Sequence, residues 1–169
     1  MLARIHHEVV RHCTAGFLGL VTVVAIVAAG CTKPVDLARN VHVMDVTTGW
    51  FDAGIVEGGK NKLVPSISFT LHNASSRNLT LQMNVQFIIL PQKENQDEVF
   101  LQAIDVPAGG SSKPVVVRAK YGFTGEQPRA EMLQHRLFQD FSVRLFAKQG
   151  SGQWTLLGEQ PVNRQLITK

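Results

Sequence analysis

The sequence predicts an all-β protein: an immunoglobulin-like antiparallel β-sandwich of about seven to nine strands, with one short helix near residues 128–137. Two observations lead to this prediction. Two neighbouring segments alternate apolar and polar residues with a period of two, and short apolar runs recur along the chain between turn-forming residues. Strict alternation indicates strands with one buried and one solvated face, which is typical of antiparallel sheets.

The alternation is clearest in residues 63–73 and 79–90, which we expect to be strands joined by a hairpin-type loop at residues 73–78. The pattern predicts that the core contains Phe69, Leu71, Met83, Val85, Phe87, Val143 and Leu145. The same pattern predicts that Ser68, Gln82 and Asn84 are exposed.

Weaker patterns complete the set of strands. Gly49 and Gly54 predict a turn after the first strand, residues 57–62 and 106–114 read as loops, and residues 149–152 read as a further turn. The remaining strands are expected at residues 41–46, 98–106, 115–121, 141–148, 154–158 and 162–167.

One segment, residues 126–138, has helical character instead. Pro128 suits the first position of a helix, and Ala130, Leu133 and Leu137 would share one helical face. A short helix that links two strands is therefore expected near residues 128–137.

The N-terminus has the features of a lipoprotein signal. A basic opening precedes residues 15–30, which carry no charge and end in small side chains before Cys31. This stretch resembles the lipobox of bacterial lipoproteins, although Ala28 stands where leucine is commonest. The resemblance implies cleavage before Cys31 and acylation of its sulfur. The expected organisation is a signal peptide at residues 1–30, a tether at 31–40 and a β-sandwich domain at 41–169.

A membrane-spanning helix is the alternative for residues 15–30. A span needs about 20 apolar residues, usually about 17–25, and this run falls just short. An uncleaved anchor would leave the domain on the same side of the membrane. We therefore expect a periplasm-facing protein in the cell envelope. Thr32 is not the aspartate associated with retention in the inner membrane of enteric bacteria, so the outer membrane is favoured over the inner one.

Composition narrows the function classes. Cys13 lies in the predicted signal, so a mature chain acylated at Cys31 has no cysteine left for a disulfide, a thiol nucleophile or a metal site. The formal net charge of +4 is mild and does not indicate a nucleic-acid partner.

The sequence contains no catalytic signature. It has no G-x-S-x-G elbow, no phosphate-binding glycine loop and no H-E-x-x-H motif. His42, His72 and His135 lie in different predicted elements, which gives no reason to expect a metal site. We expect a protein that is not an enzyme and has no cofactor and no metal.

The segment "YGFTGEQPR", residues 121–129, departs from the strand pattern and concentrates glycines, aromatic residues and charges. It reads as a shaped turn that leads into a helix, with Tyr121 and Phe123 plugging the end of the core. It also reads as a contact loop, because loops at the end of a sandwich usually carry binding residues. The candidate partner contacts are Tyr121, Phe123, Glu126, Arg129 and Arg136.

A lipid-accepting cysteine before "FTLHNASSRNLTLQMNVQFIIL" and "IDVPAGGSSKPVVV" resembles the FxLYD-type and water-stress-type β-sandwich domains of bacterial lipoproteins. The resemblance covers roughly residues 63–119. Phe87 fits the first position of the short family signature, but Leu90 and Pro91 replace its tyrosine and aspartate. The resemblance implies an envelope-facing interaction domain and carries no catalytic residues.

Two function classes follow from these expectations. The first is a lipid-anchored, non-catalytic interaction or scaffold module with an envelope protein as partner. The alternative is a binder of a small apolar or lipid ligand, which would need an apolar cavity of at least about 300 Å³.

Overall fold

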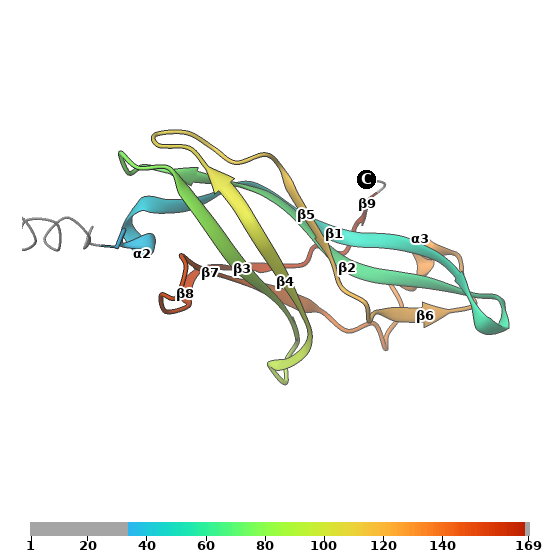
Figure 1. Cartoon of the computed structure of the whole chain (residues 1–169). Coiled ribbons are helices and arrows are strands. Elements are labelled where there is room, and N and C mark those ends of the chain that lie inside the picture. The colour runs from blue at the N-terminus through green and yellow to red at the C-terminus, as the bar shows by residue number, and fades with distance from the viewer. Residues whose placement is uncertain (1–33, 168–169) are drawn as a thin grey trace, which may run out of the picture. The chain divides into compact units, whose positions relative to one another are not determined.

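The computed structural model describes residues 34–167, and the strands among them form two sheets, which confirms the all-β sandwich (Figure 1). Sheet A contains, in order, β5 (Val115–Arg118), β2 (Lys60–Asn73), β1 (Val41–Val56) and β9 (Leu166–Ile167), with β6 (Phe123–Gly125) also paired to β2. Sheet B contains, in order, β4 (Glu94–Val106), β3 (Leu79–Ile89), β7 (Phe141–Lys148) and β8 (Thr155–Pro161).

The strand order is that of an immunoglobulin-like sandwich. The first, second and fifth strands share one sheet, while the third strand lies beside β7 and β8 in the other, with β4 added at its edge. The pairings are antiparallel except that β9 runs parallel to β1. The nine strands within residues 34–167 fall in the predicted range of seven to nine.

The core lies between the two sheets, where the predicted alternation places it. All seven predicted core side chains are fully buried: Phe69, Leu71, Met83, Val85, Phe87, Val143 and Leu145. Ser68 and Gln82, predicted to be exposed, are half-buried. Asn84 is only 8% exposed, so its predicted exposure is wrong. Its cross-strand partners in sheet B are Phe100 and Phe146.

The first strand is much longer than predicted. The expected turn at Gly49 and Gly54 does not exist, because both glycines lie inside β1. A Cβ at Gly49 would lie 2.7 Å from Ile167 Cγ2, so the missing side chain at Gly49 makes room for strand β9. Gly54 has φ 88° at a register shift between Asp52 and Ile55, where glycine relieves the strain of a bulge. The turn occurs at residues 57–59 instead.

The predicted hairpin between β2 and β3 is a crossover from sheet A to sheet B. Asn73, which is fully buried, shapes this connection. Its Nδ2 donates to the carbonyl oxygens of Arg77 (2.7 Å), Val106 (3.2 Å) and Pro107 (3.1 Å). Its Oδ1 accepts from the backbone N–H (3.0 Å) and the hydroxyl (2.7 Å) of Ser75. One side chain thus joins the β2–β3 connection to the β4–β5 connection.

The predicted helix at residues 128–137 is much shorter in the structure, where α3 comprises only Arg129–Met132. Beyond Met132 the chain turns so that Leu133 and Phe138 are buried while Leu137 is 65% exposed. The carbonyl oxygens of Leu133 and Phe138 accept hydrogen bonds from the Arg164 guanidinium. Tertiary contacts therefore override the helical pattern of this segment.

The last residues of the predicted tether pack onto the domain. Asp36 caps the short helix α2 (Leu37–Asn40), whose Leu37 is buried in the core beside half-buried Val35. The compact unit formed by the sandwich begins at Val35. Within residues 34–167, no helix has the length and apolar character needed to span a membrane. The predicted signal peptide and Cys31 lie outside the described residues.

Replacing Asn73 with Asp tests the buried amide that joins the two connections. The change removes the Nδ2 donor and places a carboxylate oxygen against three carbonyl oxygens, so we expect the free energy of unfolding to fall by at least about 3 kcal/mol. Chemical denaturation measures this loss. Asn78→Asp is the matched control, because it keeps the Oδ1 atom that accepts from the Ala108 N–H; it should cost less than about 0.5 kcal/mol. Equal losses in both variants would contradict this account of Asn73.

Candidate functional site

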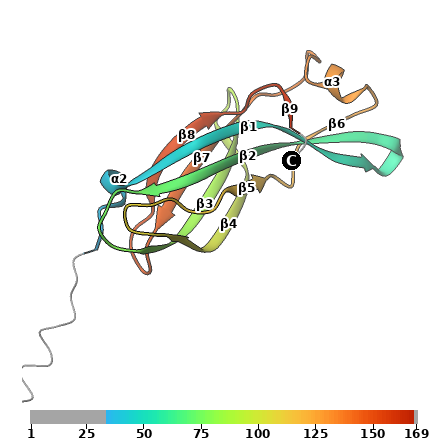
Figure 2. The same cartoon turned by 90° about the horizontal axis from the view of Figure 1, so that it is seen from above.

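The candidate contact residues gather at one end of the sandwich. We call this the distal end and define it as residues 51–62, 121–139 and 164–167. It contains the turn between β1 and β2, strand β6 and helix α3, and it lies opposite the end that carries α2 (Figures 1 and 2). The β1–β2 hairpin projects beyond the region where the two sheets face each other (Figure 2).

Strand β6 is the element that attaches the segment 121–129 to this hairpin. It pairs with β2 from Leu63↔Phe123 to Asn61↔Gly125. A Cβ at Gly122 would collide with the carbonyl oxygen of Leu63, so only glycine lets the chain approach β2 here. The glycines of "YGFTG" therefore serve a close backbone approach and a short strand rather than a free loop.

Phe123 points into an aromatic cluster that closes the distal end of the core. Its ring centroid lies 5.1 Å from that of Phe138, and Phe138 lies 4.4 Å from Trp50. Trp50 also meets the edge of Phe141 at 5.6 Å. Edge-on and tilted contacts of this kind are favourable between aromatic rings. For Phe123, the structure shows the core-plugging contacts that the sequence suggested.

Arg129 is engaged in an ion pair at the start of α3. Its Nε lies 2.5 Å from Oδ2 of Asp52 on β1, within the range of an ion pair. The guanidinium is the main cause that lowers the pKa of Asp52, and the backbone N–H of Gly54, 2.9 Å from Oδ1, lowers it further. This pair ties α3 to the β1–β2 hairpin.

Arg164 links the C-terminal segment to residues 133–140, which precede β7. Its Nε and Nη2 donate to Asp140 at 2.7 and 3.0 Å, a bidentate arrangement that also raises the pKa of Arg164. The same guanidinium donates to the carbonyl oxygens of Leu133 and Phe138 and lies 5.2 Å from the Phe138 ring centroid. The distal end is therefore held by ion pairs and aromatic packing together.

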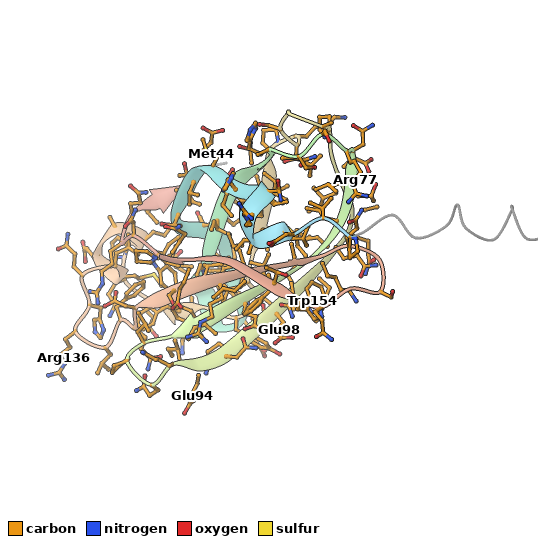
Figure 3. All side chains as sticks on the ribbon, turned by 90° about the vertical axis from the view of Figure 1, so that its left-hand side faces the viewer. Met44, Arg77, Glu94, Glu98, Arg136 and Trp154 are labelled. Carbon is orange, nitrogen blue, oxygen red and sulfur yellow. The ribbon has the colours of Figure 1, made fainter. Side chains whose placement is uncertain are left out.

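Other side chains of the distal end face solvent. Tyr121 is 64% exposed, and Glu126 and Arg136 are exposed without an ion pair to any residue in the described range. Arg136 projects away from the domain in Figure 3. Leu137 and Ile55 add exposed apolar surface. The five predicted contact residues thus divide into two that support the structure, Phe123 and Arg129, and three that are accessible: Tyr121, Glu126 and Arg136.

Hollows lie at the distal end. A groove of about 420 Å³ runs between α3 and the C-terminal strand and is lined by Ala130, Leu133, Gln134, Arg164, Gln165 and Leu166. A small pocket of about 80 Å³ is lined by residues that include Trp50, Gln96, Tyr121 and Gln139. The indole Nε1 of Trp50 is buried without a hydrogen-bond partner within residues 34–167. It leaves one donor at this end of the core unsatisfied.

The structure brings together two of the three histidines within residues 34–167. His42 and His72 stand directly opposite each other on β1 and β2, and His72 Nδ1 lies 3.3 Å from the Ser111 hydroxyl, whereas His135 lies at the distal end. No group of three or more His, Cys, Asp or Glu side chains that could hold a metal ion occurs in the part of the chain that the structure describes.

Sequence reasoning missed Trp50, Asp52 and Arg164, which together position the distal end. The first two lie in "TTGWFDAG", where the glycines suggested a turn. The strand-favouring residues Thr48, Trp50 and Phe51 would have been the signal for a continued strand. Arg164 has no local signal, because its partners are far away in the sequence.

Comparisons with known proteins identify no family for this chain. No protein-family model matches the chain, and no curated protein matches it. Among solved structures, the chain is similar to one described as the X-ray structure of Northeast Structural Genomics Consortium target SoR45. The two share 13% sequence identity with a TM-score of 0.44, over 75% of this chain and 88% of that one.

The ion pair between Asp52 and Arg129 predicts a specific dependence on pH. The lowered pKa of Asp52 means that the pair stabilises the fold fully above the ordinary aspartate pKa of about 4, and that this contribution is lost as the pH falls through the lower pKa of the folded state. Between pH 6 and 3 the wild type should lose more unfolding free energy than Asp52→Asn. The difference should be below about 1 kcal/mol, because both side chains are partly exposed.

Denaturant titrations at several pH values measure this difference. Asp52→Asn keeps Oδ1 as acceptor for the Gly54 N–H, so the comparison isolates the charge. Parallel pH profiles for the two proteins would show that the pair does not contribute.

Proposed function

We propose that the protein is a cell-envelope lipoprotein, anchored through an acylated Cys31 and facing the periplasm, that acts as a non-catalytic interaction or scaffold module. The basic start, the uncharged run of residues 15–30 and the Gly30–Cys31 junction support the anchor. Thr32 favours the outer membrane over the inner one. The mild net charge of +4 gives no support for a nucleic-acid partner.

The observation that supports the interaction role is that the distal end presents exposed side chains on a rigid segment. A contact surface needs exposed anchor side chains on a rigid support, and aromatic and arginine side chains are enriched at such hot spots. Tyr121 and Arg136 are exposed on a segment that Phe123, Arg129 and Arg164 fasten to the sandwich. Ordering this segment on binding would therefore cost little conformational entropy.

The position of α2 supports the same role. Cys31 and Asp36 are five residues apart, a length of chain that spans at most about 18 Å. In a protein anchored at Cys31, the α2 end of the sandwich would stay close to the lipid. The distal end, opposite α2, would then face the periplasm, where partners are found (Figure 1).

The alternative function, binding of a small apolar or lipid ligand, is favoured by one observation. The groove beside α3, at about 420 Å³, exceeds the volume of about 300 Å³ that such a site requires. Gln134, Arg164 and Gln165 add polar groups to its lining, and the space between the sheets is filled by fully buried side chains. A lipid binder should retain lipid through purification, which mass spectrometry of an organic extract detects; the interaction module should not.

The lipid anchor is tested by metabolic labelling with an alkyne-bearing palmitate in a bacterial host. We expect the wild-type chain to incorporate the label and to fractionate with membranes, and Cys31→Ser to lose both properties, because the acceptor sulfur is gone. Cys13→Ser is the matched control and should retain the label. Unlabelled wild-type protein that keeps residues 1–30 would contradict acylation.

The partner surface is tested by a photo-crosslinking amino acid placed at position 121, 136 or 44 of the full chain. Met44 is 49% exposed but lies outside the distal end, so it serves as the control position. We expect defined adducts with one envelope protein from positions 121 and 136 and none from 44. The adduct from position 121 should disappear in an Arg136→Glu background. Adducts of equal yield from all three positions would place the contact surface elsewhere.

A further inference from the structure

Two histidines face each other on the outer side of sheet A, near the end that carries α2. The register places His42 of β1 directly opposite His72 of β2. Leu71 and Asn73, which flank His72, are fully buried, so the two imidazoles lie on the face that points away from the core. His42 is exposed and His72 is half-buried. Directly opposite residues have Cβ atoms about 4.5–5.5 Å apart, so both rings can reach a common point above the sheet.

Met44 adds a sulfur atom to the same face. It follows His42 by two positions on β1 and is 49% exposed, whereas Met83 and Met132 are fully buried. Met44 stands diagonally opposite His72, at a separation of about 7–8 Å that long side chains can bridge. Within residues 34–167, the side chains of His42 and Met44 make no hydrogen bond or ion pair. Their nitrogen and sulfur atoms are therefore available to a ligand.

The Ser111 hydroxyl orients the ring of His72. Ser111 forms a β-bridge with His72 on the side of β2 away from β1, and its Oγ lies 3.3 Å from Nδ1. The ring edge that carries Nε2 is therefore turned away from Ser111. When Nδ1 donates to the hydroxyl, Nε2 has the free lone pair that a metal ion requires. A hydrogen bond to the second ring nitrogen is a usual feature of metal-binding histidines.

A carboxylate lies beside these side chains. The register of β1 shifts between Met44 and Thr47, and Asp45 within this bulge has φ 51°. Its Oδ2 accepts a hydrogen bond from the hydroxyl of Thr70, the residue opposite Met44, at 2.7 Å. Asp45 makes no ion pair within residues 34–167. Its negative charge therefore remains available to attract a cation.

The cations of this region belong to other elements. Lys113 lies in the segment that runs along the far side of β2, two residues after Ser111, and Arg39 lies in α2, before β1 begins. Among residues 41–51 of β1, Asp45 is the one Asp, Glu, Lys or Arg. On the β1 side of His72, the charge carried by the strand is thus negative, which favours a cation over an anion.

We propose that His42, Met44 and His72 bind a copper ion in the Cu(I) state. Imidazole nitrogen binds copper as well as zinc, whereas a thioether sulfur selects the softer Cu(I). Because the three donors are neutral, the bound ion keeps its positive charge, which the Asp45 carboxylate offsets. The site is open to solvent at His42 and Met44, so the ion can exchange with an external ligand.

The register of sheet A is what makes this site possible. The sequence gave no reason to expect a metal site, because His42 and His72 lie in different elements. Pairing of β1 with β2 places them side by side, and Met44 supplies a third donor of a type that is uncommon on an exposed sheet face. The site lies towards the α2 end of the sandwich and does not depend on the partner surface at the distal end or on the anchor at Cys31.

Competition with bicinchoninate, a chromophoric chelator of Cu(I), tests the proposal in the presence of ascorbate and without oxygen. The parent protein is the full chain in detergent with Cys13→Ser and Cys31→Ser, so that no thiol competes for copper. We expect it to withdraw about one equivalent of copper from the chelator. His42→Ala and His72→Ala should each raise the Kd for Cu(I) at least about tenfold, because each removes a donor.

Met44→Leu distinguishes a copper site from a histidine pair that binds any transition metal. Leucine keeps the size and apolar character of the side chain but has no sulfur. The Kd for Cu(I) should rise about tenfold, while the Kd for Zn(II), measured with a chromophoric zinc chelator, should change less than about twofold. Ser111→Ala should also raise the Kd for Cu(I) about tenfold, because the His72 ring loses its orienting hydrogen bond.

Histidines elsewhere in the chain provide the matched controls. His135→Ala, and a combined change of His6, His7 and His12 to Ala, should leave the Kd for Cu(I) unchanged. The proposal is overturned if the parent protein leaves the copper on bicinchoninate, or if either control abolishes binding. It is equally overturned if the variants at His42 and His72 compete as well as the parent, or if Met44→Leu binds Cu(I) with an unchanged Kd.

Discussion

The buried amide of Asn73 is the interaction on which the arrangement of the two sheets depends. The chain passes from sheet A to sheet B after β2 and returns after β4, and both passages lie at the same end of the sandwich. Asn73 satisfies three carbonyl oxygens and two donors across these passages with one side chain. Backbone bonds from Asn73 to Gly110 and from Gly109 to Ser75 complete the junction. The relative placement of β2, β3 and β5, and hence of the core, follows from this junction.

The residues of this junction are among those on which the expected resemblance to envelope β-sandwich domains was based. The strand ending in asparagine, the serine in the loop and the glycine-bearing turn before β5 are the residues that make these bonds. They are conditions for folding, and they say nothing about a partner or ligand. A motif can therefore be a sound guide to architecture and a poor guide to function.

How far the sequence predicts the structure depends on whether the information is local. Alternation placed Phe69, Phe87 and Leu145 in the core correctly, because strand geometry turns it directly into two faces. Turn propensity misled at Gly49, since that glycine makes room for Ile167, a residue far away in the sequence. Asn84 was expected to be exposed because of its place in the alternation, but it is 8% exposed between its cross-strand partners Phe100 and Phe146. The aromatic contacts of Phe123 were recognised as one of two interpretations, whereas Arg164 was not recognised at all.

The parallel pairing of β9 with β1 has a consequence for how the domain forms. Trp50 and Phe51 pair with Leu166 and Ile167, and Thr48 exchanges hydrogen bonds with Pro161, Asn163 and Gln165. The central segment of the first strand therefore cannot complete its pairing until residues 161–167 are present. Contacts so distant in sequence make folding slow. Until residues 161–167 are synthesised, β1 has an unpaired edge beside Trp50. Such an edge makes the nascent chain prone to aggregation.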